Sequence, residues 1–273
     1  MIFIAKKYKS PINWFGGKYY MAKKIINIFP KHKLYCEVFG GAGHILFRKT
    51  PSLIEVYNDI HSGLYLFFKY LRNEETREKL ITQIQLTPYS REEFNSSKNW
   101  MYEKNELEKV RKFYVRTMQA VGCNGGWCYT KSSSRRGMSQ AVSRWLRNVD
   151  ENMPDVVERL REIQIEHLDF RKCIKKYDKK DTLFYLDPPY VQGTRGLKKG
   201  YDNEMSEKDH KDLVDILINI EGKAILSGYD NNIYKRLEEN GWKKLFLGNY
   251  AKSSMCTNEG KLKVGQEFVW INF

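Results

Sequence analysis

Two stretches of this chain of 273 residues alternate short apolar runs with helical patterns, and a highly charged segment separates them. The apolar runs predict strands over residues 34–38, 53–57, 163–167, 182–186, 223–227, 242–247 and 267–273. Helical patterns cover residues 18–29, 60–71, 206–218 and 231–240. Such alternation favours parallel strands with crossover helices. We therefore expect an α/β domain formed by residues 1–72 and 163–273, with a capping box at Ser206 and Asp209.

The charged segment between these stretches, residues 73–162, is mostly helical in pattern. Its predicted helices cover residues 103–118, 139–149 and 153–162. Residues 122–137 place aromatic and β-prone side chains between Gly, Asn and Ser clusters, which predicts a β-hairpin. The expected architecture is an α/β domain with a mainly helical insertion that carries a hairpin.

Composition narrows the class of partner. The 47 Lys and Arg residues against 33 Asp and Glu give a formal net charge of +14, which favours a polyanion, although a solvated basic surface is the alternative. No apolar run approaches the roughly 18 residues that span a bilayer, and residues 1–9 lack the order of a secretory signal. We expect a cytoplasmic protein. Cys123 and Cys128 lack a second Cys or His pair at finger-like spacing, so we expect buried thiols and no metal.

A glycine-rich turn, Glu37-Val38-Phe39-Gly40-Gly41-Ala42-Gly43, directly follows the first predicted strand. Glycine lets the backbone turn tightly and approach a ligand, although a plain turn has the same pattern. Asp59 ends the next strand, where a carboxylate can accept hydrogen bonds from ribose hydroxyls or cap a helix. These features fit a nucleoside site without distinguishing a nicotinamide from S-adenosylmethionine.

The strand over residues 182–186 leads straight into Asp187-Pro188-Pro189-Tyr190. Two prolines end the strand and stiffen its exit. The amino nitrogen of adenine is a poor nucleophile, and a carboxylate with a backbone carbonyl can accept both of its N–H bonds. An aromatic ring can stack on a base that has left the helix. The segment therefore favours direct methyl transfer to an amino group, without a metal or a covalent enzyme intermediate.

These segments, taken in order over nearly the whole chain, resemble the Dam-type, alpha-group DNA adenine methyltransferases of bacteria and phages. Ile12-Asn13-Trp14-Phe15-Gly16-Gly17-Lys18 is similar to the family's N-terminal cofactor segment, and Asn58-Asp59 follows the glycine turn as expected. Ser227-Gly228-Tyr229-Asp230 and Glu267-Phe268-Val269-Trp270 match its tail. The resemblance implies a Rossmann-like S-adenosylmethionine-dependent methyltransferase fold, an insertion that recognises double-stranded DNA, base flipping, and S-adenosylhomocysteine as product.

The resemblance also implies roles by position. Asp187 and the Pro188 carbonyl would bind the target amino group, with Pro189 in the same turn and Tyr190 stacked on the flipped base. The implied cofactor-binding residues are Trp14, Gly16, Gly17, Lys18, Glu37, Phe39, Gly40, Gly41, Ala42, Gly43, Asp59, Asp169, Phe170 and Asp187. Lys18 would meet the cofactor's carboxylate, Asp59 its ribose and Asp169-Phe170 its adenine. Phe15 and His44 depart from the family pattern and leave the pocket's shape open.

Basic side chains of the insertion are candidates for DNA contact, with a solvated basic face as the alternative for each. The expected DNA-binding residues are Arg111, Arg116, Asn124, Trp127, Lys131, Arg135, Arg136 and Arg144, with Lys112 and Arg147 in the same clusters. They do not reveal the recognised DNA sequence.

Other functions fit less well. A nicotinamide-dependent dehydrogenase would need a third glycine where Ile45 and Leu46 stand. Protein or RNA methyltransferases with a similar turn usually begin it with Asn, and amino-cytosine enzymes with Ser, where this chain has Asp187. A DNA-binding regulator with a silent methyltransferase fold is disfavoured by the intact turn and by Asp59. We expect a monomer, and a cognate restriction endonuclease as partner stays open.

Overall fold

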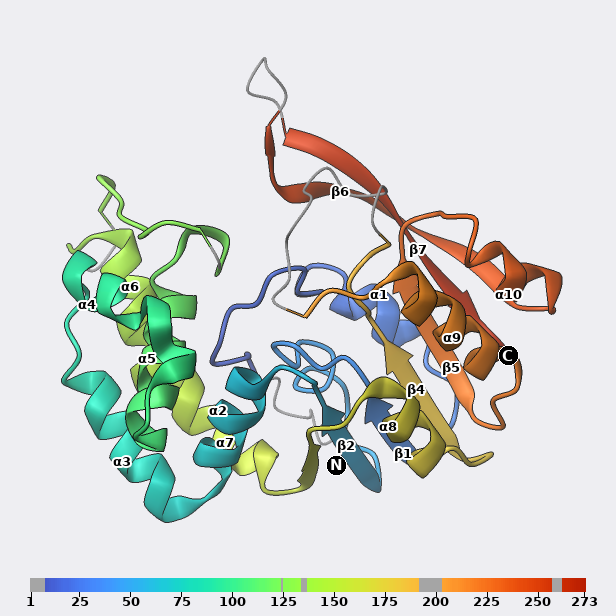
Figure 1. Cartoon of the computed structure of the whole chain (residues 1–273), viewed down its shortest axis with the longest axis horizontal. Helices are drawn as coiled ribbons and strands as arrows, with labels where there is room; N and C mark the ends of the chain where they lie inside the picture. Colours follow the sequence, from blue (N-terminus) through green and yellow to red (C-terminus); the bar gives the residue numbers. More distant parts are fainter. Residues whose placement is uncertain (1–7, 124, 134–136, 192–202, 257–261) are drawn as a thin grey trace, which may run out of the picture. The chain divides into compact units, whose positions relative to one another are not determined.

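The computed structural model describes residues 8–123, 125–133, 137–191, 203–256 and 262–273, which form two compact units (Figure 1). One unit contains Lys18–His61 and Ile163–Phe273 and is built on a β-sheet. The other contains the residues up to Gly17 together with Ser62–Glu162 and is helical. We call them the sheet unit and the helical unit.

The described part of the sheet unit has seven strands in the order β3-β2-β1-β4-β5-β7-β6. Their bounds are β1 Leu34–Glu37, β2 Ile54–Asn58, β3 Ile163–Glu166, β4 Thr182–Leu186, β5 Lys223–Gly228, β6 Lys243–Cys256 and β7 Leu262–Ile271. Neighbours among β1 to β5 are parallel, whereas β7 is antiparallel to β5 and to β6. Glu37 lies opposite both Tyr57 and Tyr185, so β1, β2 and β4 end at the same edge.

Helices of the sheet unit are α1 Ala22–Asn27, α8 Phe170–Tyr177, α9 Glu207–Ile218 and α10 Lys235–Glu239. Figure 1 shows α8 and α9 over one face of the sheet. Cys36, Phe184 and Leu226 share a buried apolar core with these helices. Successive side chains of a strand point to opposite faces, so the buried Tyr35 and Tyr185 point to the other face. The sheet is therefore covered on both sides, as its continuous apolar strands require.

The expected capping box at the start of α9 is present. The Ser206 hydroxyl accepts a hydrogen bond from the Asp209 backbone N–H (3.2 Å), and the Asp209 carboxylate accepts one from the Ser206 N–H (2.9 Å). Helix α8 begins with another cap, because Asp169 accepts a hydrogen bond from the Arg171 N–H. These caps fix where the two crossover helices start.

The described helical unit consists of short helices around α5. The bounds are α2 Ser62–Arg72, α3 Glu74–Gln85, α4 Arg91–Ser96, η1 Ser97–Tyr102, α5 Glu106–Met118, η2 Val121–Cys123, α6 Gln140–Arg147, η3 Asn148–Asn152 and α7 Met153–Leu160. Side chains of Asn73, Ser90 and Asn105 cap α3, α4 and α5. Aromatic rings fill the space between helices: Tyr114 stacks on Phe67 at 5.3 Å between ring centroids.

Helix α2 belongs to the helical unit, although the sequence assigned residues 1–72 to the α/β domain. The reason is close packing on Gly63, where an added Cβ would lie 2.5 Å from the Phe113 ring and 2.8 Å from the Trp100 ring. Such approach lets α5 and η1 pack directly on the α2 backbone. The residues up to Gly17 also cluster there, since Tyr114 donates a hydrogen bond to the Pro11 carbonyl.

The hairpin expected over residues 122–137 is shorter and less regular in the structure. Isolated antiparallel bridges join Ala120 to Trp127 and Ser133 to Ser139, without a regular ladder among the described residues of this segment. Gly122 and Cys123 have positive φ, 61° and 75°, as residues of a tight hairpin turn do. The Val121 N–H donates to the Gly126 carbonyl at 2.8 Å and the Cys128 N–H to the Gln119 carbonyl at 2.7 Å, so a short antiparallel pairing flanks this turn. A long hairpin occurs instead in β6 and β7, which extend beyond the predicted runs.

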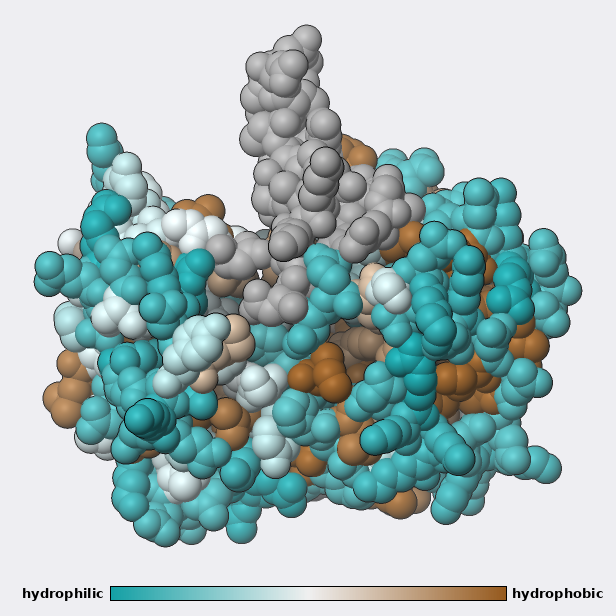
Figure 2. Space-filling model, in the orientation of Figure 1, coloured by the Kyte–Doolittle hydropathy of each residue, from teal (hydrophilic) through white to brown (hydrophobic). Residues whose placement is uncertain are grey.

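The surface drawn in Figure 2 is mostly hydrophilic. This agrees with a chain in which 29% of residues are charged. Within the described part of the chain, every helix is too short or too polar to cross a membrane.

Candidate active site

Three predicted motifs meet at the carboxyl edge of the parallel strands. The glycine turn Phe39–Gly43 follows β1, Asp59 follows β2, and Asp187 follows β4. The strand order reverses direction at β1 and β4, and open α/β sheets bind ligands at such a switch point. The sheet therefore gathers side chains that are up to about 150 residues apart in the chain at a place suited to a ligand.

The glycine turn lies directly on the ring of Tyr57. A Cβ on Gly40 would lie 2.2 Å from this ring, and the Tyr57 hydroxyl donates a 2.7 Å hydrogen bond to the Gly41 carbonyl. The Gly40 N–H donates to the Asn58 carbonyl at 2.8 Å. Gly41 and Gly43 have φ of 51° and 68°, which disfavours side chains. The turn thus keeps its backbone packed closely on the sheet.

Asp59 holds the glycine turn in place. Its Oδ2 accepts a hydrogen bond from the Gly41 N–H at 2.7 Å, and its Oδ1 accepts one from the His61 N–H at 2.8 Å. Burial raises the pKa of this carboxyl, while the two backbone donors oppose the change. Each carboxylate oxygen has a second lone pair. Asp59 can therefore accept a ligand hydroxyl while it fixes the turn.

Asn58 connects two parts of this edge, a role that its place in the sequence does not reveal. Its side-chain amide donates to the Val38 carbonyl (2.8 Å) and to the Leu168 carbonyl (3.1 Å). Its oxygen accepts from the Leu168 N–H at 2.9 Å. An amide suits this position because it donates and accepts at once. Asn58 thereby ties the end of β1 to the loop that leads into α8.

Asp169 and Phe170, expected at the cofactor's adenine, lie at the start of α8. The Phe170 ring lies 5.8 Å from the Phe39 ring, at 34° between planes, so two aromatic side chains line this part of the edge. The Asp169 carboxylate pairs with Arg171 at 3.0 Å, and the Arg171 guanidinium lies 4.2 Å from the Phe170 ring centroid. The Phe170 ring is buried in the apolar core, and the partly exposed Phe39 ring that packs against it can offer an apolar surface to a flat ring system.

Glu37, another expected cofactor residue, points into the protein and is only 2% exposed. Its Oε2 accepts hydrogen bonds from the Tyr35 hydroxyl (2.8 Å) and the Leu46 N–H (2.9 Å). Burial raises its pKa to about 8. Glu37 therefore supports the chain that follows the glycine turn, and Ala42 in that turn is also buried.

Asp187 forms a buried ion pair with Lys18. The Lys18 Nζ lies 2.7 Å from Asp187 Oδ1, with side chains 3% and 16% exposed. Burial raises the pKa of Asp187 to about 6; Lys18 lowers it, and the nearby Glu267 raises it. Lys18 was expected at the cofactor's carboxylate, whereas in the structure it pairs with the carboxylate of Asp187, in the turn that follows β4.

Tyr190, at the end of the Asp187-Pro188-Pro189-Tyr190 turn, is held by residues of two other strands. Its hydroxyl donates a 2.7 Å hydrogen bond to Glu267 Oε2 on β7. Its ring centroid lies 4.4 Å from that of Tyr229, which follows β5, and 4.8 Å from Lys18 Nζ. The sequence predicted Tyr190 as a stacking residue but gave Glu267 and Tyr229 no role.

Trp14, Gly16 and Gly17 belong to the helical unit. The Trp14 ring packs 6.0 Å from the Phe113 ring, the Gly17 N–H donates to the Trp14 carbonyl at 3.2 Å, and Gly16 has a φ of 76°. Their role as cofactor residues stays a prediction.

Arg111 was expected on a DNA-binding surface, but the structure pairs it with acidic residues inside the helical unit. Its guanidinium donates to Glu108 at 2.6 Å, to Glu93 at 2.6 Å and to the Thr87 hydroxyl at 2.9 Å. Its side chain is only 11% exposed. A guanidinium whose donors are taken up by partly buried acidic partners has little left for phosphate. Arg111 therefore links α5 to α4 within the helical unit.

Arg116 and Lys112 are also engaged inside the helical unit. Arg116 donates to the Gly125 carbonyl at 2.8 Å and lies 4.5 Å from the Phe94 ring centroid. Lys112 pairs with Glu103 at 2.7 Å. The charge pattern of α5 therefore reflects internal pairing more than a free basic face.

Other expected DNA-binding residues of the helical unit are more accessible. Lys131 and Arg144 are exposed, and Trp127 is partly exposed, stacked on Tyr129 at 5.9 Å and covered by the exposed Arg91 guanidinium at 4.7 Å. Arg147 is exposed as well. Asn124, Arg135 and Arg136 lie outside the described residues.

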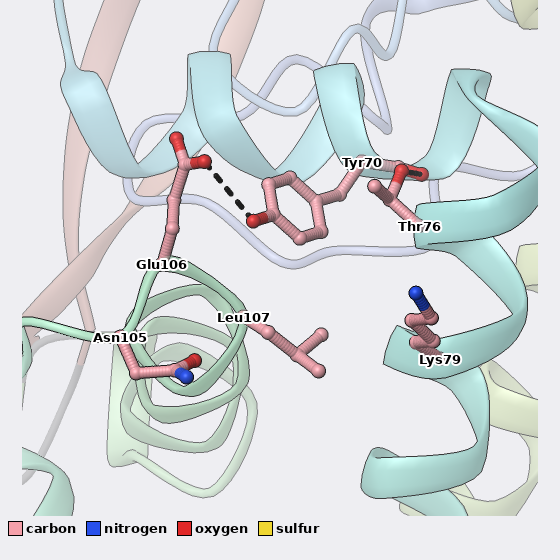
Figure 3. Close-up of a pocket in the computed structure, with 6 residues that line it drawn as sticks. All are labelled: Tyr70, Thr76, Lys79, Asn105, Glu106 and Leu107. Carbon is pink, nitrogen blue, oxygen red and sulfur yellow. Dashed lines mark hydrogen bonds between the residues drawn. The ribbon is translucent and has the colours of Figure 1, made fainter.

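A separate pocket in the helical unit contains none of the residues predicted from sequence (Figure 3). Its lining residues are Tyr70, Thr76, Lys79, Asn105, Glu106 and Leu107. The Tyr70 hydroxyl donates a hydrogen bond to Glu106 at 3.1 Å. Across the described residues, no cluster of three or more His, Cys, Asp or Glu side chains could hold a metal ion.

The sequence matches known proteins along most of its length. The model of the family described as D12 class N6 adenine-specific DNA methyltransferase matches residues 14–245. Among curated proteins, modification methylase LlaI of Lactococcus lactis subsp. lactis is 23% identical over 74% of this chain and 33% of its own length. Modification methylase StsI of Streptococcus sanguinis is 22% identical over 78% of this chain and 34% of its own length. The chain thus spans about a third of these relatives.

Among solved structures, a protein of Pyrococcus horikoshii assigned as an RNA methyltransferase covers 97% of this chain and 87% of its own. Its sequence identity is 8% and its TM-score 0.37, so this similarity carries no argument.

Proposed function

Because the chain belongs to the D12 class N6 adenine-specific DNA methyltransferases, we propose that it transfers a methyl group from S-adenosylmethionine to the N6 amino group of adenine in duplex DNA. The observation that carries the proposal is the buried Asp187 carboxylate at the carboxyl edge of β4, beside the glycine turn of β1. A carboxylate in this place can accept hydrogen bonds from an amino group presented to a bound nucleoside.

The residues of the sheet unit fit the cofactor. The glycine turn packs its backbone directly on the Tyr57 ring, and a backbone with so few side chains can approach a nucleoside closely. Asp59 keeps free lone pairs for ribose hydroxyls, and the partly exposed Phe39 ring, packed against the buried Phe170, offers a surface for adenine. When bound, S-adenosylmethionine supplies an electrophilic methyl group and leaves as S-adenosylhomocysteine. The residues of this chain bind and orient the nucleoside and keep the glycine turn fixed.

On the target side, Asp187 and the Pro188 carbonyl accept the two N–H bonds of the adenine amino group. These hydrogen bonds favour a more tetrahedral nitrogen, so they strengthen as the nitrogen becomes nucleophilic. The base must leave the helix to reach them. Tyr190 provides an aromatic face for the flipped base, and its buried position excludes water around the amino group.

We propose that the helical unit recognises the target DNA. A chain with a formal net charge of +14 favours a polyanion, and the exposed Lys131 and Arg144 are suited to phosphate contacts. The partly exposed Trp127, with Tyr129 and Arg91, could contact bases or the sugar edge.

The named relatives suggest a biological role. Both are modification methylases, so we propose that this chain modifies cytoplasmic DNA and protects it from a cognate restriction endonuclease. Resistance of the modified DNA to the endonuclease that cuts the same sequence tests this role; DNA that stays sensitive after complete methylation contradicts it.

The decisive experiment is methylation of unmethylated genomic DNA by the purified protein with S-adenosylmethionine. Nucleoside mass spectrometry identifies the modified base, and modification-aware sequencing locates it. We expect N6-methyladenine at one short motif, and none with the Asp187→Ala variant. Absence of any methylated base, with DNA binding intact, would leave a DNA-binding protein with a silent fold; methylcytosine would identify an amino-cytosine enzyme.

A further inference from the structure

Glu267 is a buried carboxylate at the candidate active site whose partners are two tyrosines. It lies on β7, is 4% exposed, and accepts a 2.7 Å hydrogen bond from the hydroxyl of Tyr190. The hydroxyl of Tyr229 also donates to it, and burial together with Glu267 raises the pKa of Tyr229 well above its usual value. The proposed chemistry assigns no step to this carboxylate.

The antiparallel direction of β7 explains how Glu267 reaches the site. Phe268 lies opposite Gly228, the last residue of β5. Glu267 therefore stands just beyond the carboxyl end of β5, where Tyr229 follows that strand. A parallel strand in this position would bring its last residues to the edge, whereas the antiparallel β7 brings an earlier one. Strands β4, β5 and β7 thus deliver Tyr190, Tyr229 and Glu267 to one place.

Hydrogen bonds from tyrosine hydroxyls to a buried carboxylate are strong and directional. A buried carboxylate is costly unless donors satisfy it, and a hydrogen bond to an ionised acceptor is shorter and stronger than one between neutral groups. Two tyrosine hydroxyls converge on Glu267, so both rings lose rotational freedom together. Their centroids are 4.4 Å apart with 59° between ring planes.

We propose that Glu267 is a positioning residue that fixes the ring of Tyr190, through its hydroxyl, in the orientation on which the flipped adenine stacks. The inference rests on the proposed function. Lys18 Nζ lies 4.8 Å from the same ring and pairs with Asp187, so the orientation of Tyr190 and that of the acceptor carboxylate are linked. A tilted ring would misplace the amino group relative to Asp187, and misplacement by about 1 Å can cost about 100-fold in rate.

The test compares Glu267→Gln, Tyr190→Phe and the double variant on the purified full chain. Tyr190→Phe keeps the ring and deletes the hydroxyl, while Glu267→Gln keeps the shape and removes the charge. We expect each single variant to lower kcat for methyl transfer about tenfold, with KM for DNA and Kd for S-adenosylmethionine changed less than about threefold. Because both remove the same interaction, the double variant should be little worse than either single one.

A matched control exists in the helical unit, where Tyr70 donates a similar hydrogen bond to Glu106 (Figure 3). Glu106→Gln removes a carboxylate paired with a tyrosine that the proposed chemistry does not use, so kcat should stay at the wild-type value. Thermal unfolding of all variants separates a loss of stability from a loss of positioning.

A second measurement follows the tyrosines without catalysis. In protein labelled with 3-fluorotyrosine, the ¹⁹F signals of Tyr190 and Tyr229 are assigned by their loss in the Phe variants. Glu267→Gln should shift or broaden both, and Glu106→Gln neither. Any of three results would overturn the inference: ¹⁹F signals of Tyr190 and Tyr229 that are unchanged in Glu267→Gln, a wild-type kcat in that variant, or losses of kcat that add up in the double variant. A wild-type protein that transfers no methyl group to adenine overturns the proposed function instead, and the ¹⁹F spectra then still decide whether Glu267 holds the rings.

Discussion

The ammonium group of Lys18 and the carboxylate of Asp187 form an ion pair of 2.7 Å in which neither side chain is more than 16% exposed. Burial alone favours the neutral form of a carboxyl group. Lys18 opposes this effect, and the pKa of Asp187 is raised only to about 6. Asp187 is therefore mostly ionised at neutral pH, the form that can accept hydrogen bonds from an amino group.

This pair predicts how the rate depends on pH. The rate of methyl transfer should fall as the pH decreases through about 6, because protonated Asp187 loses an acceptor. Replacing Lys18 by Met removes the opposite charge and leaves Glu267, which raises the pKa of Asp187 further. A lost charge partner is worth about 1–3 pKa units. We expect the acid limb of Lys18→Met to move to higher pH by that amount.

The measurement is kcat against pH for both proteins at saturating DNA and S-adenosylmethionine. At pH 7 Lys18→Met should be about tenfold slower, with much of the loss recovered near pH 9. Lys24→Met, at a lysine that donates to the Leu247 carbonyl, is the control and should keep the wild-type profile. An acid limb at the same pH in Lys18→Met would mean that Asp187 does not determine the profile.

Asp187 itself gives the simplest prediction. Asp187→Ala should abolish methyl transfer while the fold and cofactor binding are largely retained, because the glycine turn and Asp59 do not depend on this side chain. Calorimetric titration with S-adenosylmethionine and the nucleoside assay measure the two properties separately. Turnover like that of the wild type in this variant would remove Asp187 from the assigned role.

Gly40 tests the close contact beneath the glycine turn. An added Cβ would lie 2.2 Å from the Tyr57 ring, so Gly40→Ala must displace the turn or the ring. We expect a loss of stability of about 1–3 kcal/mol from overpacking and weaker binding of S-adenosylmethionine. Thermal unfolding and calorimetric titration measure both effects.

The matched change is Gly126→Ala in the helical unit, where an added Cβ has no neighbour within 4 Å. Its stability should stay within about 0.5 kcal/mol of the wild type. Equal cofactor affinity in Gly40→Ala and the wild type would contradict the assignment of this turn to the cofactor.

The site at the carboxyl edge could be predicted where its residues directly follow apolar runs. Asp59 and Asp187 each end a buried strand, and parallel strands bring such residues to one edge whatever their separation in the chain. Asn58 and Glu267 escaped prediction because their roles depend on distant partners. The Leu168 group that Asn58 binds is 110 residues away, and Tyr190 is 77 residues from Glu267.

In the helical unit, the sequence predicted a DNA-binding role for a residue that the structure engages in internal ion pairs. A charge pattern gives the sign of each side chain and not its partner, so Arg111 looked like a free basic residue. Its partner Glu93 lies 18 residues away on another helix. The place of α2 was equally hidden, since only the packed structure reveals that Gly63 lets the Phe113 ring reach its backbone.

The two kinds of basic residue in this unit should respond differently to mutation. Lys131→Ala combined with Arg144→Ala removes two exposed charges, so DNA binding should weaken and the slope of log K against log salt should decrease in magnitude by about 2. Binding titrations at several salt concentrations measure this slope.

Arg111→Ala is the contrasting variant. It leaves Glu93 and Glu108 without their common partner, so we expect a loss of stability of about 2–4 kcal/mol in denaturant unfolding. Because Arg111 is only 11% exposed, the salt slope should stay at the wild-type value under conditions where the variant is folded. If Arg111→Ala reduces the salt slope as much as loss of one exposed lysine does, Arg111 belongs to the DNA-binding surface after all. If the double variant of Lys131 and Arg144 leaves the salt slope unchanged, the phosphate contacts lie elsewhere.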